Sequence, residues 1–241
     1  MRRLLPDPGE TTVEQQLGDY RPWEEPGEER PHVAMNFAAT LDGRATIEGR
    51  SGQIGSATDT AMLVELRTRF DAVMIGAGTM RAERYGRIVP DQGKRERRER
   101  LGLPHDPLVV IVSGRLDLPW DAPLFSESGR VLVFTAADEE PPEVESSLRV
   151  VRHEGRVEMR EALRYLRRER GIRALLCEGG PRLHSELWSL GLVDELFLTM
   201  APKLTGAGPS ILEGELPAPT PLELAWLLEQ DGELFGRYRR A

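Results

Sequence analysis

Short apolar runs alternate along the chain with longer stretches in which apolar residues recur at helical spacing. The clearest runs are HVAMNFAAT (32–40), DAVMI (71–75) and LVVIV (108–112), which have the length of strands and few polar positions. Such runs are typical of strands that are covered on both faces. The stretches 58–70 and 158–170 place their apolar residues on one face of a helix. This alternation of strands and helices predicts an α/β domain.

The same alternation continues to the C-terminus. Further strands are predicted at 131–135, 150–151, 172–176 and 193–200, with a helix at 181–190. The last two apolar runs flank Asp231-Gly232, which is a strong hairpin signal, so we expect the final strands to be antiparallel. The predicted fold is a mixed, mostly parallel sheet that is flanked by helices and carries a C-terminal antiparallel hairpin, in one domain from residue 31 to residue 241.

Two segments lack this pattern. Residues 1–30 are rich in Pro, Gly, Glu and Asp and show little periodicity, so they are predicted to form an extended N-terminal arm. Residues 91–106 (DQGKRERRERLGLPHD) are a charged connection in which arginines are interleaved with glutamates. Charge runs of this kind are usually solvated, so a solvent-exposed helix or loop is predicted here.

Two strands end in a glycine turn that a helix follows. Gly76-Ala77-Gly78-Thr79 comes after the strand at 71–75, and Gly179-Gly180-Pro181 comes after the strand at 172–176. Backbone N–H groups at a helix N-terminus attract anions, and proline suits the first helical position. Each turn alone could be a plain tight turn, and neither completes the GxGxxG pattern. Together they favour a dinucleotide site at the C-terminal ends of parallel strands.

The charge balance and the cysteine content exclude several classes of function. The chain has 241 residues and a formal net charge of −8, which argues against a general nucleic-acid-binding surface. A single cysteine, Cys177, excludes an intrachain disulfide and a cysteine-based zinc cluster. Four scattered histidines show no ligand spacing, so no metal is predicted. No apolar run reaches the roughly 18 residues of a membrane helix, and the N-terminus lacks the apolar core of a signal peptide, so we expect a soluble, cytoplasmic protein.

Four motifs carry a family resemblance: MNFAATLDGR, GAGTMRAE, LLCEGGPRL and GLVDELFLTMAPKLTGAG. In this order they resemble the reductase domain of bacterial riboflavin biosynthesis, which belongs to the dihydrofolate-reductase-like superfamily. The resemblance runs roughly from residue 31 to the C-terminus. It implies a dihydrofolate-reductase-like fold and an NADPH-dependent reductase. The P-C-x-x-C signature of the zinc deaminase that accompanies this domain in bifunctional proteins is absent, so the likeness is to stand-alone reductases.

The resemblance also assigns residues to catalysis and to the substrate. Asp42 and Glu178 match the proposed catalytic positions, near the nicotinamide and on the substrate side. A turn at Asp42-Gly43 is the alternative for Asp42. A carboxylate such as Glu178 at the end of a buried strand is costly without partners, which supports a site role. The substrate-binding set is Asn36, Ser51, Arg67, Arg87 and Glu178.

The two arginines of the substrate-binding set are supported by the sequence to different degrees. Arg67 would suit a phosphate through its guanidinium, and an exposed helix residue is the alternative for it. The segment around Arg87 (ERYGRIV) departs from the Asp-Asp-Pro segment that is usual in the family. The resemblance therefore supports the placement of Arg87 less directly than that of Arg67.

The cofactor that the resemblance implies is NADPH. Ser113 and Arg115 follow a strand at the place where such folds meet the adenosine 2′-phosphate, and an arginine there would favour NADPH over NADH. A surface turn is the alternative for these two residues. The complete cofactor-binding set is Ala39, Thr40, Gly76, Gly78, Thr79, Glu83, Ser113, Arg115, Gly179, Gly180, Pro181, Arg182 and Leu183.

Three functions are compatible with these motifs. The first is an NADPH-dependent reductase of a ribosylaminopyrimidine 5′-phosphate, which passes hydride to the ribosyl group. The second is a dihydrofolate- or pteridine-type reductase on the same fold, and the third is a nucleotide-binding protein without catalysis. The expected partner is a small pyrimidine or pteridine, with neither nucleic acid nor membrane, and the resemblance implies a homodimer.

Overall fold

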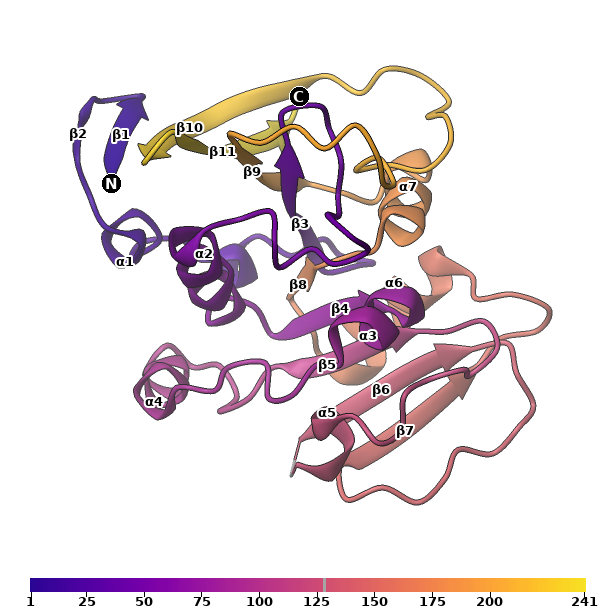
Figure 1. Cartoon of the computed structure of the whole chain (residues 1–241). Helices are drawn as coiled ribbons and strands as arrows, with labels where there is room; N and C mark the ends of the chain where they lie inside the picture. The colour runs from indigo at the N-terminus through magenta and orange to yellow at the C-terminus, as the bar shows by residue number, and fades with distance from the viewer. Residues whose placement is uncertain (128) are drawn as a thin grey trace. The chain divides into compact units, whose positions relative to one another are not determined.

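The computed structural model describes residues 1–127 and 129–241, and its strands and helices alternate along the chain (Figure 1). The chain divides into two compact units. Unit 1 contains Met1–Tyr20, Val33–Leu66 and Pro181–Ala241. Unit 2 contains Arg21–His32 and Arg67–Gly180. Among the described residues, no helix has the length and apolar character that a membrane span requires.

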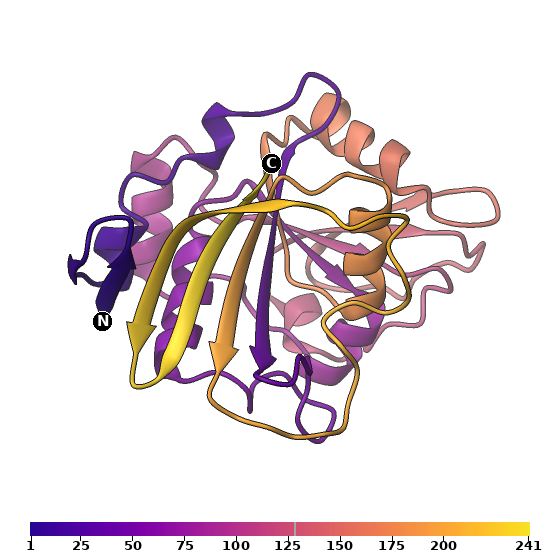
Figure 2. The same ribbon diagram turned by 90° about the horizontal axis from the view of Figure 1, so that it is seen from above.

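Unit 1 is built on mostly antiparallel strands. They are β1 (Arg2–Leu5), β2 (Gly9–Glu10), β3 (His32–Thr40, in this unit from Val33), β9 (Glu195–Ala201), β10 (Leu222–Gln230) and β11 (Glu233–Arg240). Their order is β2-β1-β10-β11-β9-β3, and Figure 2 shows β10, β11, β9 and β3 side by side. β3 pairs with β9 in parallel, whereas the other neighbours are antiparallel. Parallel pairing directs the C-terminal ends of β3 and β9 to the same edge, where Asp42 follows β3.

Unit 2 is built on parallel strands. They are β4 (Ala72–Gly76), β5 (Leu108–Val112), β6 (Arg130–Thr135), β7 (Ser147–Arg152) and β8 (Ala174–Cys177). Their order is β8-β4-β5-β6-β7, with all pairings parallel, and the run from β4 to β7 is visible in Figure 1. Nearly every residue of β4, β5, β6 and β8 is buried, as the continuous apolar runs predicted.

Helices connect these strands. Their bounds are α1 (Val13–Gln16), η1 (Pro22–Glu24, a 3₁₀ turn), α2 (Ala57–Arg67), α3 (Ala77–Glu83), α4 (Gln92–Arg100), α5 (Pro123–Ser126), α6 (Met159–Arg170) and α7 (Pro181–Ser189). α6 shows why the apolar spacing predicts helices well: Met159, Ala162, Leu163 and Leu166 are its buried residues. Gly171 ends α6 in the left-handed conformation, at φ 66°.

The fold class predicted from the sequence is confirmed. The structure is α/β with mixed, mostly parallel strand pairing, and the last two strands form an antiparallel hairpin. Asp231 and Gly232 link these strands, and both have positive φ (52° and 81°), as a two-residue hairpin turn requires. The predicted strand bounds differ from the observed ones by a few residues, mainly at 147–152, where β7 is longer than expected.

Residues 1–30 contain more regular structure than their composition predicted. They include β1, β2, α1 and η1, and α1 opens with a capping box between Thr12 and Gln15. In unit 1 the Tyr20 hydroxyl donates to Glu195 Oε2 at 2.7 Å. In unit 2 Glu29 pairs with Arg164 and Arg168 of α6. Long-range contacts therefore order this segment, and such contacts leave no periodic signal in the sequence. A domain boundary at residue 30 stays a prediction.

The solvated character predicted for residues 91–106 is wrong for two arginines. The segment forms α4, in which Arg98 is fully buried and Arg95 is 9% exposed, whereas Arg100 is exposed. Burying an arginine is costly unless its N–H groups are hydrogen-bonded. Both buried side chains donate to backbone carbonyls, and a charged run in the sequence does not show which of its arginines find such partners.

Candidate functional site

A buried ion pair joins Arg67 and Glu178 in unit 2. Arg67 is the last residue of α2, and Glu178 follows β8 directly. Arg67 Nε lies 2.6 Å from Glu178 Oε1, and Arg67 Nη2 lies 2.6 Å from Glu178 Oε2. The two side chains are 12% and 3% exposed. Two parallel, charge-assisted hydrogen bonds fix the orientation of both groups and offset the cost of burying them.

Tyr85 completes this cluster. Its hydroxyl donates to Glu178 Oε2 at 3.2 Å, and the Arg67 guanidinium carbon lies 5.5 Å from the centre of its ring. Burial raises the pKa of Tyr85, and the negative charge of Glu178 adds to this rise. Burial alone would lower the pKa of Arg67, but the Glu178 carboxylate raises it overall. At neutral pH Tyr85 is therefore a hydrogen-bond donor and Arg67 a cation.

The geometry of this cluster tests the alternatives that the sequence left open for Arg67 and Glu178. The alternative that Arg67 is an exposed helix residue is wrong, because its side chain is mostly buried. Glu178 has the partners that a buried carboxylate needs. The Arg67–Glu178 contact spans 111 positions of sequence, and sequence spacing carries no signal for it. The third member, Tyr85, is absent from the predicted site residues, and its position shortly after the first glycine turn is the signal in the sequence that could have indicated it.

The two glycine turns lie against each other in unit 2. The Gly76 N–H donates to the Gly179 carbonyl at 2.6 Å. A Cβ on Gly76 would lie 3.3 Å from Gly179 O and from Gly180 N, and a Cβ on Gly180 would lie 2.8 Å from Thr79 Oγ1. A Cβ on Gly78 would meet nothing within 4 Å. A side chain at position 76 or 180 would therefore be crowded where the turns meet, whereas the space at Gly78 is open.

We expect Gly180→Ala to destabilise the protein, because the added methyl group lies too close to the Thr79 hydroxyl. A thermal melt should show the loss, at about 1–3 kcal/mol for an overpacked contact. Gly78→Ala is the matched control for stability. It adds the same methyl group in open space within α3, where alanine is the better helix former, so its Tm should be unchanged or higher. Equal melting temperatures of the two variants would contradict the packed-turn geometry.

The other predicted residues of unit 2 differ in burial and in contacts. Ser113 is buried after β5, and its N–H donates to the Phe134 carbonyl at 2.9 Å, whereas Arg115 is exposed. Glu83 is half-buried at the end of α3. Arg87 pairs with Asp106, with Nη2 2.6 Å from Oδ2, and this hydrogen bond raises the pKa of Arg87. The structure thus pairs Arg87 with a carboxylate other than Glu178.

In unit 1, Asp42 anchors a loop. Its Oδ1 accepts from the Thr40 hydroxyl at 2.6 Å and from the Thr205 N–H at 3.3 Å, and its Oδ2 accepts from the Gly206 N–H at 2.8 Å. The Thr40 hydroxyl and, next, the Gly206 N–H lower the pKa of Asp42 to about 2. These bonds reach the loop after β9 and go beyond a local turn. Asp42 is an ionised hydrogen-bond acceptor at neutral pH and does not carry a proton to donate.

Since the folded pKa of Asp42 lies below its ordinary value of about 3.9, its stabilising effect is present above that value and is lost as the pH falls through about 2. We expect the Asp42 side-chain carboxyl carbon to titrate near pH 2 by NMR. The acidic limb of a pH–rate profile above pH 5 should likewise owe nothing to Asp42. A titration midpoint near pH 4 would contradict the hydrogen bonds assigned to this side chain.

The remaining predicted residues of unit 1 have varied settings. Arg182 is exposed and lies 3.8 Å from Glu213. The others are Asn36 (half-buried in β3), Ala39 and Thr40 (buried in β3), Ser51 (exposed), Pro181 (first residue of α7) and Leu183 (buried in α7).

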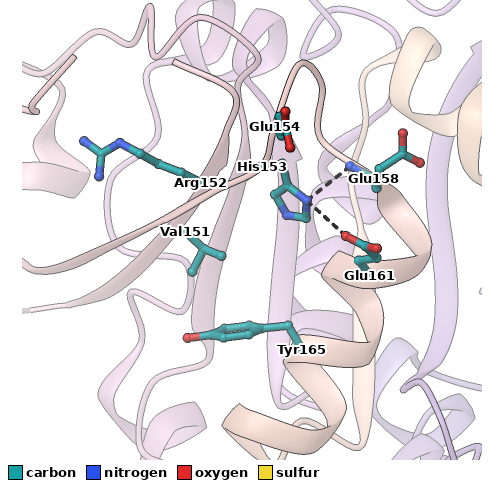
Figure 3. Close-up of a pocket in the computed structure, with 7 residues that line it drawn as sticks. All are labelled: Val151, Arg152, His153, Glu154, Glu158, Glu161 and Tyr165. Atoms are coloured by element: carbon teal, nitrogen blue, oxygen red, sulfur yellow. Dashed lines mark hydrogen bonds and ion pairs between the residues drawn. The ribbon is translucent and has the colours of Figure 1, made fainter. Parts of the chain in front are cut away.

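A hollow of about 530 Å³ lies elsewhere in unit 2, between the end of β7 and α6 (Figure 3). It is lined by Val151, Arg152, His153, Glu154, Glu158, Glu161 and Tyr165. His153 Nδ1 accepts from the Glu158 N–H at 3.5 Å and lies 3.7 Å from Glu161 Oε2, as the dashed lines show. Because no predicted site residue lines this hollow, we do not assign the candidate site to it. The described residues contain no group of His, Cys, Asp or Glu that could hold a metal ion.

Comparisons with known proteins show which family this chain belongs to. The family model described as "RibD C-terminal domain" matches residues 31–230. The chain is 36% identical over 193 residues to the 2,5-diamino-6-ribosylamino-4(3H)-pyrimidinone 5′-phosphate reductase of Archaeoglobus fulgidus, covering 77% of this chain and 88% of that protein. It is 31% identical to the riboflavin biosynthesis protein RibD of Chlamydia trachomatis, covering 73% of this chain but only 47% of that protein.

Two solved structures have folds similar to that of this chain. A pyrimidine reductase-like protein from Corynebacterium diphtheriae superposes with a TM-score of 0.81 at 28% identity, covering 96% of this chain and 99% of that one. Dihydrofolate reductase from Enterococcus faecalis superposes with a TM-score of 0.50 at 15% identity, covering 87% and 96%. The second likeness concerns the fold alone, and it confirms the dihydrofolate-reductase-like architecture.

Proposed function

The chain belongs to the RibD C-terminal domain family of riboflavin-pathway reductases, and we propose that it reduces a ribosylaminopyrimidine 5′-phosphate with NADPH. In this reaction the cofactor supplies hydride, a proton is added, and the ribosyl group becomes a ribityl chain. The observation that carries the proposal is the buried Arg67–Glu178–Tyr85 cluster beside the paired glycine turns. The name of the Archaeoglobus fulgidus relative supports the choice of substrate class.

Glu178 is suited to an aminopyrimidine ring. A carboxylate offers about four acceptor sites. In the described part of the chain, Oε2 accepts from Arg67 Nη2 and Tyr85, whereas Oε1 accepts from Arg67 Nε alone. One acceptor site of Oε1 is thus available to an amino group of the substrate. The ion pair holds this oxygen in a fixed direction, so the site is preorganised for a donor.

The glycine turns are suited to a dinucleotide. Backbone can approach a ligand closely where Cβ atoms are absent, and the open space beside Gly78 provides that approach at the start of α3. Exposed Arg115 follows β5 and would neutralise a 2′-phosphate, which supports NADPH over NADH. Asp42 stays a predicted catalytic residue, and its ionised state gives it an orienting role by charge and hydrogen bonding.

We expect Arg115→Gln to raise the KM for NADPH by about tenfold, because the variant loses a charged hydrogen bond to the 2′-phosphate, worth about 1.5–3 kcal/mol. NADH lacks this phosphate, so its kcat/KM should stay within about twofold and serves as the internal control. The measurement is initial-rate kinetics with both cofactors. A similar loss for both would show that Arg115 does not read the phosphate.

The test of the function is a side-by-side assay of cofactor oxidation by the full chain. Three compounds are compared: the diaminopyrimidinone ribosyl phosphate, the aminouracil ribosyl phosphate and dihydrofolate. Turnover of either ribosyl phosphate supports the proposal. Turnover of dihydrofolate alone would favour the pteridine reductase, and NADPH binding without turnover of any of them would favour the non-catalytic alternative. A homodimer stays a prediction, which sedimentation velocity can check.

A further inference from the structure

Two arginines of α4 are buried on one face of that helix. Arg95 and Arg98 are three residues apart, a spacing that places side chains on the same side of a helix. Arg98 is fully buried, and burial lowers its pKa to about 10, so it remains charged at neutral pH. The structure pairs these guanidinium groups chiefly with backbone carbonyls. Among them are the carbonyl of Arg67 itself and those of Val89 and Pro90, next to the Ile88 carbonyl that Arg67 contacts.

Arg98 holds the main chain of Arg67. Its Nη1 donates to the Arg67 carbonyl at 2.9 Å and to the Phe70 carbonyl at 2.8 Å, and its Nε donates to the Pro104 carbonyl at 2.9 Å. The first two carbonyls lie at the C-terminal end of α2, where a positive charge is favourable. The rigid fork of a guanidinium can satisfy all three acceptors at once, and a lysine ammonium on a flexible stem cannot reproduce this geometry.

Arg95 holds the segment 88–90 through two of its carbonyls. Its Nη1 donates to the Val89 carbonyl at 2.9 Å and to the Pro90 carbonyl at 2.5 Å. The preceding carbonyl, that of Ile88, accepts from Arg67 Nη1 at 3.2 Å. Three consecutive carbonyls are therefore held by two arginines, one from α4 and one from the candidate site. Tyr85 lies three residues before this segment and contacts Glu178 directly.

We propose that Arg98 and Arg95 are positioning residues, which fix the main chain of Arg67 and the segment 88–90 so that the Arg67 guanidinium holds Glu178 in the direction of the substrate. This rests on the proposed function of the cluster. Arg98 acts at the backbone of Arg67, and Arg95 acts at the segment that receives the third hydrogen bond of the Arg67 guanidinium. Neither residue touches substrate or cofactor in this account.

The test compares three variants of the full chain. Arg98→Lys keeps the charge and removes the fork. Arg100→Lys makes the same exchange at an exposed position of α4 and is the matched control. Leu166→Ala removes core packing on α6 and controls for a general loss of stability. At a temperature below the Tm of every variant, we expect Arg98→Lys to lower kcat/KM about tenfold, and both controls to stay within about twofold.

A second readout does not depend on turnover. The Nε–H resonance of Arg67, assigned by its loss in Arg67→Lys, should exchange slowly with solvent because it donates to buried Glu178. We expect Arg98→Lys to shift this resonance and to speed its exchange, and Leu166→Ala to leave both unchanged. If Arg98→Lys fails to fold, Arg95→Lys is measured by the same two readouts.

The outcomes separate the two proposals. An unchanged Arg67 resonance in folded Arg98→Lys or Arg95→Lys would overturn the positioning role. The role would also be overturned if Leu166→Ala lost as much kcat/KM as Arg98→Lys while the two variants lost the same amount of Tm. Absence of turnover in the wild-type protein would instead contradict the proposed function. The Arg67 resonance would still decide whether α4 positions the cluster.

Discussion

Replacing Glu178 by glutamine is expected to lower kcat/KM by about 10- to 100-fold, because a hydrogen bond to a charged group contributes about 1.5–3 kcal/mol. The amide keeps the shape of the side chain. It removes the negative charge that Arg67 and Tyr85 hold in place, and it weakens the acceptor that we assign to the aminopyrimidine. Steady-state kinetics with the ribosyl phosphate substrate measures the effect.

Glu29→Gln is the matched control for this change. Glu29 also bridges two arginines, Arg164 and Arg168, but all three side chains are more than half exposed. Surface ion pairs contribute about 0–1 kcal/mol, so this variant should keep kcat/KM within about twofold. Activity of Glu178→Gln at the wild-type level, in a folded protein, would remove Glu178 from the mechanism.

The second large effect concerns stability. Arg67→Met is expected to lower the free energy of unfolding by about 3–5 kcal/mol, because it leaves the Glu178 carboxylate buried without its cation. The double variant Arg67→Met/Glu178→Leu removes both charges, and apolar replacements of a buried ion pair are often neutral or stabilising. We therefore expect the double variant to recover most of the lost stability in urea titrations.

Activity should not recover with stability. The double variant lacks both the carboxylate and the guanidinium, so its kcat/KM should remain at least about tenfold below wild type. Recovery of stability without recovery of activity would show that the ion pair is retained for function. Additive loss of stability in the double variant would contradict a coupled, buried pair, since side chains in direct contact show non-additive effects.

The fold could be predicted from the sequence where each signal is local. The run LVVIV became β5, the apolar spacing of 158–170 became α6, and Asp231-Gly232 became the hairpin turn. Each of these depends on neighbours within a few positions, and periodicity or turn chemistry reports them directly. The regular structure in residues 1–30 escaped prediction because it is stabilised by distant partners, such as Glu195 for Tyr20.

The site was predicted residue by residue but not as an arrangement. The family resemblance assigns both Glu178 and Arg67 to the substrate, yet only the folded chain shows that each is the other's partner. The two glycine turns were recognised separately, and their contact depends on the pairing of β4 with β8. In α4 the sequence does not distinguish the buried arginines from the exposed ones. All its arginines read alike in sequence, and only the carbonyls within reach distinguish Arg98 from Arg100.

The most direct test of the central claim is the identity of the product. The purified full chain is incubated with NADPH and the diaminopyrimidinone ribosyl phosphate, and the pyrimidine product is analysed by mass spectrometry and NMR. We predict a ribityl phosphate, heavier by two hydrogens, formed in step with NADPH oxidation and strongly reduced in Glu178→Gln. An unchanged ribosyl phosphate, with NADPH bound but not oxidised, would contradict the account.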